Sequence, residues 1–447
     1  MRPLEWLLLL SFAPVLLTPI IPQIWRRRWL VVFAPLSALV GVLHLVIEGW
    51  RIQMLPLYGL AALVLVSRIP ALLGREGAVR RGRGILVSVV LALMIIPSGI
   101  VAGWLLPVVT LPELTGPYSV GIVDRELVDE ARDRRLMVSV WYPADQTDAP
   151  APLTHHPDEV TTALGNLSGL PALAYQHLRY FKLNASENVP AAVGDGPFPV
   201  LVFSHGMVGL RLQSSSMLQE LASWGYVVVS LDHTDAAAVT VFPDGEVRFY
   251  DLERFGVPPD VEPNTALMNE HVFPVWVADQ RFVYDMLESW QVDDPLLAGK
   301  LDLTRIGSFG HSFGGATALE VCRLDERCGA AVNMDGALYG DLWTQPAARP
   351  LLLMTSADSS QYTDTVDAWK HMISDAHDAA YWLELPSSNH LSFTLTPLLS
   401  PILAPDGFDP RAGLRTVDTY LRAFFDTYLR GSGMFSSSGT DVSWLAD

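Results

Sequence analysis

Cysteine is scarce in this chain of 447 residues, which contains only Cys322 and Cys328. Two cysteines at this separation provide neither the ligand spacing of a cysteine metal site nor the C-x-x-C arrangement of a redox pair. A disulfide between them would suit a domain outside the cytoplasm. Two small buried hydrophobic side chains are the alternative, and the sequence leaves both possibilities open.

Lysine is also scarce, with three residues in all, and the basic residues are unevenly distributed. Residues 1–110 contain ten arginines and three glutamates, a net charge of +7. Of the 30 basic and 48 acidic residues, the remainder therefore carries 20 and 45, a net charge of −25. Such an acidic domain lacks the basic surface that nucleic-acid binding requires, and its charge favours solubility. We expect a membrane region joined to a soluble domain, with no nucleic-acid partner.

Residues 1–110 contain four apolar stretches, at 4–25, 29–48, 53–73 and 84–106. Each is close to the ~20 residues that a helix needs to cross the hydrocarbon core of a membrane. The first stretch follows Arg2 but lacks an A-x-A-like cleavage site, and three more stretches come after it. It is therefore interpreted as a retained helix rather than a signal peptide. The sequence predicts a transmembrane anchor of four helices over residues 1–110.

The arginines of this region predict its orientation. The loop between the second and third stretches has only Arg51, whereas the other two loops hold seven arginines, at 26, 27, 28, 75, 80, 81 and 83. The positive-inside rule places those two loops in the cytoplasm and both termini outside. We expect a multi-pass protein of the cytoplasmic membrane whose soluble domain is extracytoplasmic. His44 and Glu48 share a helical face near the outer end of the second span, and we assign them no function.

Beyond residue 110, short β-branched runs alternate with stretches of helical periodicity. Alternating strands and helices predict right-handed crossovers and a doubly wound, mostly parallel sheet. Binding sites in such sheets lie at the carboxyl ends of the strands. We therefore expect one α/β domain over residues 111–447. Residues 143–197 interrupt the alternation and are predicted to form a lid-like insertion, because long ordered insertions often cover a site.

A Gly-x-Ser-x-Gly string runs from Gly310 to Gly314, with Ser312 at its centre. Such a string arises by chance in roughly one chain of this length in seven, taking Gly and Ser at about 7% each. Here it follows a strand-like segment at 305–309 and opens a helical segment at 315–322, which is the setting that a nucleophile elbow requires. The helix N-terminus also favours developing negative charge. Ser312 is therefore the predicted nucleophile of an α/β-hydrolase.

A serine nucleophile needs a general base, and in this fold the chain order is serine, acid, histidine. His390 lies in a loop just after a strand-like segment at 381–385, so it is the predicted base. Asp335 and Asp358 each end a strand-like segment between the serine and the histidine. Order along the chain does not decide which of the two aspartates is the acid.

The oxyanion of an acyl-transfer reaction needs two preorganised backbone N–H groups. Phe313, directly after the nucleophile, is one predicted donor, and Met207, in the loop after the strand-like segment 199–203, is the other. His205 is expected to brace this loop and His233 to line the pocket. No cofactor is expected, and no metal, because the His155–His156 pair has no third ligand in sequence.

Three segments resemble the platelet-activating-factor acetylhydrolase family and its bacterial relatives, which overlap the dienelactone-hydrolase-like carboxylic ester hydrolases. These segments are Val202–Gly206 with Arg211, Ile306–Thr317 and Arg327–Asp335, and the resemblance covers about 119–430. It implies an α/β-hydrolase fold, ester hydrolysis, oxyanion amides at Met207 and Phe313, and a catalytic histidine at His390. In that family the acid follows the strand after the nucleophile helix, and this favours Asp335 over Asp358.

Two departures from the family bear on the substrate. The family often has an aromatic residue shortly after the acid, whereas Gly336 and Ala337 follow Asp335 here. The well-known lipoprotein-associated members also lack a four-span N-terminus. Their phospholipid substrate is therefore not carried over automatically.

The sequence predicts a serine hydrolase that cleaves short-acyl or lipid-like esters, including modified phospholipids, through an acyl-enzyme on Ser312. Acyl transfer to an alcohol by the same three side chains is an alternative. A non-catalytic membrane protein that uses a hydrolase-like domain for binding is a third, from a different class. The sequence does not indicate acyl length, leaving group or oligomeric state.

Overall fold

A computed structural model describes the chain except for residues 18–20, 73–80, 194–195, 346, 348, 437–441 and 447. Its contacts divide it into two compact units, one made mainly of Met1–Val109 and the other of Thr110–Tyr175, Arg179–Leu398 and Leu403–Asp447. Arg75 and Arg80, on which the predicted orientation partly rests, lie outside the described residues.

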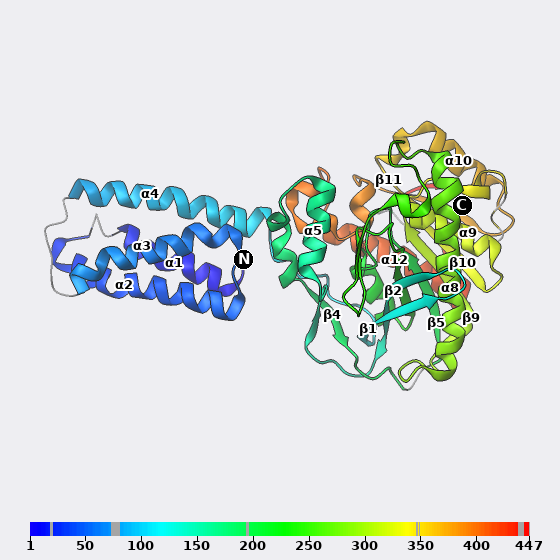
Figure 1. Ribbon diagram of the computed structural model, residues 1–447, viewed down its shortest axis with the longest axis horizontal. Coiled ribbons are helices and arrows are strands. Elements are labelled where there is room, and N and C mark those ends of the chain that lie inside the picture. Colours follow the sequence, from blue (N-terminus) through cyan, green and yellow to red (C-terminus); the bar gives the residue numbers. More distant parts are fainter. Residues whose placement is uncertain are drawn as a thin grey trace. The chain divides into compact units, whose positions relative to one another are not determined.

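The N-terminal unit is helical (Figure 1). Helix α1 contacts α2 and α4, and α3 also contacts α2 and α4, so the four helices form a bundle around buried Leu8, Phe12 and Leu57. Its elements are α1 (Pro3–Leu17), α2 (Gln23–Leu43), η1 (His44–Glu48), η2 (Ile52–Met54), α3 (Leu55–Leu72), α4 (Arg81–Ile100) and η3 (Val101–Leu105).

By length and composition, the described residues contain one helix that could cross a membrane, Val31–Glu48, rather than the four that were predicted. Three further apolar helices are shorter: Pro3–Leu17, Ile52–Val66 and Val89–Leu105. Each of these three is shorter than the ~20 residues that a helix needs to cross the hydrocarbon core.

Within the described residues of the second unit, eleven strands form one mixed sheet, in the order β13-β12-β11-β10-β9-β5-β6-β2-β1-β4-β3. The neighbouring strands β6, β5, β9, β10, β11 and β12 run parallel, and antiparallel pairs lie toward the edges. The strands are β1 (Ser119–Asp129), β2 (Arg134–Ala144), β3 (Pro150–Pro152), β4 (Lys182–Glu187), β5 (Phe198–Ser204), β6 (Val227–Asp232), β9 (Leu301–His311), β10 (Cys328–Met334), β11 (Leu351–Ser356), β12 (Ala380–Leu385) and β13 (Ser443–Ala446). The prediction of a mostly parallel α/β sheet is confirmed.

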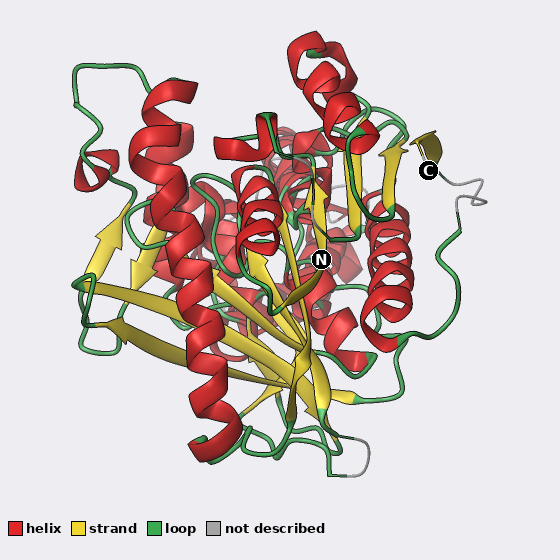
Figure 2. Ribbon diagram, turned by 90° about the vertical axis from the view of Figure 1, so that its right-hand side faces the viewer, coloured by secondary structure: helices red, strands yellow, loops and turns green. Residues whose placement is uncertain are grey.

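Helices flank the strands of this sheet (Figure 2). Val200 and Val202 of β5 pack in one core with Trp276 of α8, whereas Gly307 of β9 faces Phe425 and Leu429 of α12. The sheet is therefore covered on both faces, which is why β5 and β6 are buried along their whole length and mostly apolar. The helices are α5 (Pro157–Ser168), α6 (Ser215–Ser223), α7 (Thr265–Leu267), α8 (Phe273–Asp293), α9 (Phe313–Leu324), α10 (Thr363–Ser374), α11 (Thr396–Leu399) and α12 (Pro410–Arg430).

The remaining elements are irregular helical turns and a small second sheet. Strands β7 (Val239–Val241) and β8 (Val247–Phe249) pair with each other. The turns are η4 (Ala172–Tyr180), η5 (Leu252–Phe255), η6 (Met268–Val272), η7 (Gly340–Trp343), η8 (Ser359–Gln361), η9 (His390–Phe393) and η10 (Pro401–Leu403).

Residues 143–197 contribute to the sheet as well as to its surroundings. Strand β4 pairs parallel with β1 and antiparallel with β3, so this segment extends the sheet edge. Its predicted role as a lid stays a prediction.

Cys322 and Cys328 form a disulfide between the end of α9 and the start of β10, with their Cα atoms 4.9 Å apart. Of the two alternatives that the sequence allowed, the disulfide is the one found.

Candidate active site

Ser312 occupies the turn between β9 and α9, with φ +57° and ψ −125°. A positive φ is unusual for a residue with a side chain and persists only where the surroundings impose it. Here the Ser312 N–H donates to the Met334 carbonyl at 2.8 Å. A Cβ atom on Gly310 would lie 2.2 Å from the Gly314 carbonyl oxygen, and one on Gly314 would lie 2.2 Å from the Ser204 carbonyl oxygen. Both glycines of the string are therefore required by close backbone approach.

His390 and Asp335 form a hydrogen-bonded pair, with His390 Nδ1 2.8 Å from Asp335 Oδ2. Asp335 directly follows β10 and is fully buried at its side chain, whereas the His390 side chain is 46% exposed. The carboxylate accepts three further hydrogen bonds, from the Ser356 N–H at 2.8 Å and from the Ser356 and Ser359 hydroxyls, each at 2.9 Å. Asp335 thereby fixes the direction in which the imidazole points.

Two opposing effects set the pKa of Asp335. Burial alone would raise it, but the hydrogen bond from His390, the charge of His390 and the donors Ser356 and Ser359 outweigh burial, so the pKa lies below the usual 3.8. The carboxylate is therefore ionised near neutral pH. Its natural partner is an N–H at His390 Nδ1, which leaves Nε2 as a proton acceptor.

Asp358 is not part of this arrangement. It lies at the start of the turn Ser359–Gln361 and is exposed. Within the described residues its carboxylate forms no hydrogen bond or ion pair, and it does not line the cavity beside Ser312. The structure thus brings Asp335, and not Asp358, to His390.

Ser312, Asp335 and His390 line one cavity of about 370 Å³. In the described part of the chain the Ser312 hydroxyl makes no hydrogen bond to His390, and in enzymes without substrate such contacts are often long. Most of the cavity wall is apolar or aromatic, and its known lining contains no lysine or arginine. The other lining residues are Met207, Tyr250, Leu252, Pro263, Met268, Phe313, Ala337, Tyr339, Ser359, Tyr362, Thr365 and Trp369.

Both predicted oxyanion donors, Met207 and Phe313, are among these residues. Phe313 is the first residue of α9, where backbone N–H groups have no intrahelical partner. The Gly206 carbonyl accepts bonds from His205 Nδ1 at 2.6 Å and from the Gly209 N–H at 2.8 Å. Because the peptide group is planar and trans, fixing this carbonyl also fixes the Met207 N–H in the opposite direction. His205 thus braces the loop, as its position in the sequence predicted.

His233 does not line the cavity, contrary to expectation. It is fully buried, its ring stacks on Trp276 with centroids 3.8 Å apart, and its Nδ1 lies 3.1 Å from Asp279 Oδ2. Burial lowers the pKa of His233 to about 3, so its imidazole is neutral. Asp279 also binds Arg134 through contacts of 2.6 and 2.7 Å. Sequence inspection missed this network because its members lie on β2, α8 and the end of β6.

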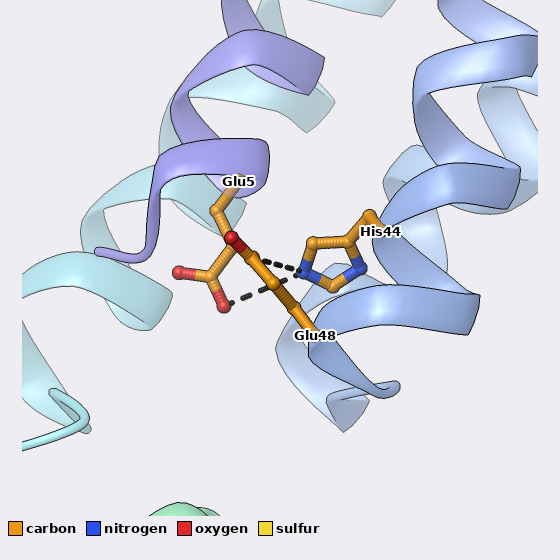
Figure 3. A group of neighbouring side chains, drawn as sticks. All are labelled: Glu5, His44 and Glu48. Carbon is orange, nitrogen blue, oxygen red and sulfur yellow. Dashed lines mark ion pairs between the residues drawn. The ribbon is translucent and has the colours of Figure 1, made fainter.

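Three side chains that could together bind a metal ion, Glu5, His44 and Glu48, converge in the N-terminal unit (Figure 3). The guanidinium of Arg2 approaches all three, at 3.0 Å from Glu5 Oε1, 3.6 Å from Glu48 Oε2 and 3.2 Å from His44 Nε2. Arg51 binds Glu5 as well, at 2.9 Å. Two arginines therefore neutralise the two carboxylates, and Arg2 stands where a metal ion would have to bind. This donor set does not fit a metal.

Comparison with known proteins gives the following matches. The family model for platelet-activating factor acetylhydrolase, isoform II, matches residues 105–247 and 285–413. The platelet-activating factor acetylhydrolase of Cavia porcellus is 28% identical over 284 residues, which cover 57% of this chain and 62% of that protein. The Canis lupus familiaris protein of the same name is 26% identical over 288 residues, or 58% and 63% of the two chains. The match thus spans less than two thirds of either mammalian relative.

Two further matches extend over more of the other protein. A probable 1-alkyl-2-acetylglycerophosphocholine esterase of Arthroderma benhamiae is 28% identical over 374 residues, covering 75% of this chain and 90% of that protein. Among solved structures, a ferulic acid esterase from Streptomyces cinnamoneus aligns with a TM-score of 0.60 and 26% identity. That alignment covers 77% of this chain and 100% of the esterase.

Proposed function

The chain belongs to the platelet-activating factor acetylhydrolase, isoform II, family, and we propose that it is a serine hydrolase that cleaves carboxylic esters through an acyl-enzyme on Ser312. The observation that carries this proposal is the arrangement at one cavity. A strained elbow presents Ser312, and beside it a buried carboxylate holds His390 by a 2.8 Å hydrogen bond. Ester-cleaving relatives and an esterase of similar fold support it.

The proposed reaction has two steps, formation of an acyl-enzyme and its hydrolysis. Ser312 Oγ attacks the ester carbonyl carbon while His390 Nε2 takes the hydroxyl proton. The N–H groups of Met207 and Phe313 bind the oxyanion of the tetrahedral intermediate. His390 then gives its proton to the leaving alcohol as the C–O bond breaks, and the acyl group stays on Ser312. Water then attacks the acyl carbon of the acyl-enzyme while His390 Nε2 takes a proton from it. His390 returns a proton to Ser312 Oγ as the bond from Ser312 Oγ to the acyl carbon breaks and the acid is released. Asp335 remains ionised and orients His390 throughout.

We propose short-acyl or lipid-like esters, including modified phospholipids, as substrates. A cavity of about 370 Å³ with apolar and aromatic walls accepts an uncharged acyl chain. Tyr339 supplies an aromatic wall close to the acid, and its ring centroid lies 4.6 Å from that of Phe313. It provides an aromatic side chain four positions after Asp335, beyond Gly336 and Ala337. Because the known lining has no lysine or arginine, an anionic headgroup would remain outside the cavity.

We further propose that the N-terminal unit anchors the enzyme in the cytoplasmic membrane. Val31–Glu48 is the supporting span. The finer proposal is that all four helices are embedded and that the hydrolase domain is extracytoplasmic. The disulfide between Cys322 and Cys328 is in keeping with an oxidising compartment. Alkaline phosphatase and a cytoplasm-specific reporter, each fused to the C-terminus, test this orientation, and activity of the cytoplasmic reporter alone would refute it.

Labelling with a fluorophosphonate tests the catalytic proposal. The full-length protein in detergent is labelled beside Ser312→Ala and beside Ser289→Ala, a control that removes an exposed serine on α8. We expect wild type and Ser289→Ala to be labelled and to hydrolyse p-nitrophenyl acetate, and Ser312→Ala to do neither. Labelling that persists in Ser312→Ala would exclude Ser312 as nucleophile. Product analysis with an added alcohol separates hydrolysis from acyl transfer.

A further inference from the structure

We propose that His311, the residue before the nucleophile, is a positioning residue that joins the oxyanion loop to the loop carrying the catalytic base. This inference rests on the proposed function, since it concerns the arrangement of the same site. His311 is the last residue of β9 and is buried. It does not line the cavity, so it acts through other residues and not on the substrate.

Both ring nitrogens of His311 have hydrogen-bond partners, and these partners determine which nitrogen donates and which accepts. Its Nε2 lies 2.7 Å from the main-chain carbonyl oxygen of His390. A carbonyl oxygen only accepts, so Nε2 carries the proton and donates. Its Nδ1 lies 3.1 Å from the side-chain nitrogen of Gln213, and in this tautomer Nδ1 accepts from that amide. The His311 imidazole therefore accepts a hydrogen bond at Nδ1 and donates one from Nε2.

Gln213 continues the connection to the oxyanion loop. Its Oε1 accepts from the Gly206 N–H at 3.4 Å, which fixes the amide orientation because a backbone N–H needs an acceptor. The backbone carbonyl of Gln213 also accepts from the Leu395 N–H at 2.8 Å, five residues beyond His390. The bonds run from Gly206 through Gln213 and His311 to His390. They connect the three segments that supply the proposed oxyanion donor, nucleophile and base.

Packing around His311 leaves its ring little freedom. A Cβ atom on Gly206 would lie 2.9 Å from His311 Nδ1, so only glycine fits against the ring at this point. On the other side, the ring centroids of His311 and His390 are 4.6 Å apart. The imidazole therefore works as a rigid spacer that sets the separation between the oxyanion loop and the base.

His311 is suited to hydrogen bonding and not to proton transfer. Burial, together with the charge that His390 carries when protonated, holds the pKa of His311 at about 3. The ring is therefore neutral wherever a serine esterase is assayed, and the direction of its two bonds does not change with pH in that range. A pKa this low also makes His311 a weak base.

Three substitutions separate this role from a general effect on folding. The amide nitrogen of His311→Gln reaches the position of Nε2 and keeps a donor for the His390 carbonyl. In His311→Asn the shorter side chain reaches only the position of Nδ1, so that bond is lost. His311→Phe keeps a ring of similar size without either bond. A displacement of about 1 Å in a reacting group costs roughly 10²-fold in rate.

We expect His311→Asn and His311→Phe to lower kcat for p-nitrophenyl acetate by about 10²-fold with KM nearly unchanged. His311→Gln should recover most of that kcat. Gln213→Met, which touches neither the base nor the nucleophile, should lower kcat in the same manner, because it cuts the connection at its other end. Thermal denaturation of each full-length variant in detergent identifies any that fail to fold.

Equal kcat for folded His311→Gln and His311→Asn would overturn the positioning role, as would a loss confined to KM. Wild-type kcat in folded Gln213→Met would overturn the connection to the oxyanion loop. These outcomes are distinct from failure of the proposed function. In that case the wild-type protein itself would show no Ser312-dependent fluorophosphonate labelling.

Discussion

Replacing Asp335 by asparagine tests the acid and the tautomer of the base at once. The substitution keeps the size of the side chain and replaces one carboxylate oxygen by an NH2 group. In the native site, Oδ1 faces the Ser356 backbone N–H at 2.8 Å, whereas Oδ2 faces His390 Nδ1 and two hydroxyl groups. The new NH2 group must occupy one of these two positions.

The surroundings decide which position it takes. A backbone N–H cannot become an acceptor, so the amide oxygen has to remain beside Ser356. The NH2 group then points at His390 Nδ1, while the Ser356 and Ser359 hydroxyls can rotate to accept. To receive that donor, the His390 proton must move from Nδ1 to Nε2. An imidazole with its proton on Nε2 cannot accept the proton of Ser312.

The corresponding substitution in the well-studied serine protease triad lowers kcat about 10⁴-fold, equivalent to about 5.5 kcal/mol in the barrier. We expect Asp335→Asn to reduce kcat for p-nitrophenyl acetate by this order, with little change in KM. Asp358→Asn is the matched control, since its carboxylate is exposed and makes no bond within the described residues. Steady-state kinetics of both variants, with circular dichroism for folding, provide the measurement. A large loss in Asp358→Asn together with an active Asp335→Asn would refute this reasoning.

Three further predictions concern stability and the elbow. Because burial keeps the pKa of His233 at about 3, the unfolded chain takes up a proton near pH 6.5 that the folded chain does not, and stability falls as pH drops below that value. Urea denaturation should show that lowering pH from 7 to 5 destabilises wild type by about 2 kcal/mol more than His233→Gln, and equal pH dependence would contradict this. Gly314→Ala should abolish fluorophosphonate labelling because its Cβ would lie 2.2 Å from the Ser204 carbonyl, whereas Gly59→Ala, with no atom within 4 Å, should be labelled normally. Replacing Cys322 and Cys328 by alanine should lower the free energy of unfolding by about 2 kcal/mol, from the small loop that the disulfide closes, and unchanged denaturation midpoints would argue against that contribution.

The parts of the site that the sequence predicted have short-range signals. The proposed nucleophile, Ser312, is marked by a strand, a glycine-flanked serine and a helix within about 18 consecutive positions. Phe313 was predicted as an oxyanion donor because it directly follows Ser312. Met207 was predicted as the other donor because it comes after a strand and Gly206. For Asp335, the local pattern was equally consistent with Asp358, and only resemblance to a family favoured one over the other. In the structure this choice depends on Ser356 and Ser359, which hold the Asp335 carboxylate from the next strand.

The parts that were missed depend on contacts between distant residues. His311 and His390 are 79 positions apart, and Gln213 and His311 are 98 apart, so no local pattern reveals their hydrogen bonds. His233 was expected to line the pocket, but it is fully buried and its hydrogen-bond partner Asp279 lies on α8. In the N-terminal unit, hydropathy located four helices but not their ends. Within the described residues, three of the apolar helices are shorter than the ~20 residues that a membrane span needs.

A single geometric rule accounts for the placement of both Ser312 and Asp335. Each is the residue directly after a parallel strand, and each has a positive φ, of 57° and 59°. The Ser312 N–H donates to Met334 of β10 at 2.8 Å, and the Asp335 N–H donates to Met354 of β11 at 2.7 Å. Both backbones thus continue the ladder for one residue beyond the strand before they turn. These bonds offset the strain of roughly 1–3 kcal/mol that each conformation costs. Because β9, β10 and β11 are adjacent in register, the two turned side chains are presented at the same edge of the sheet, where His390 can join them.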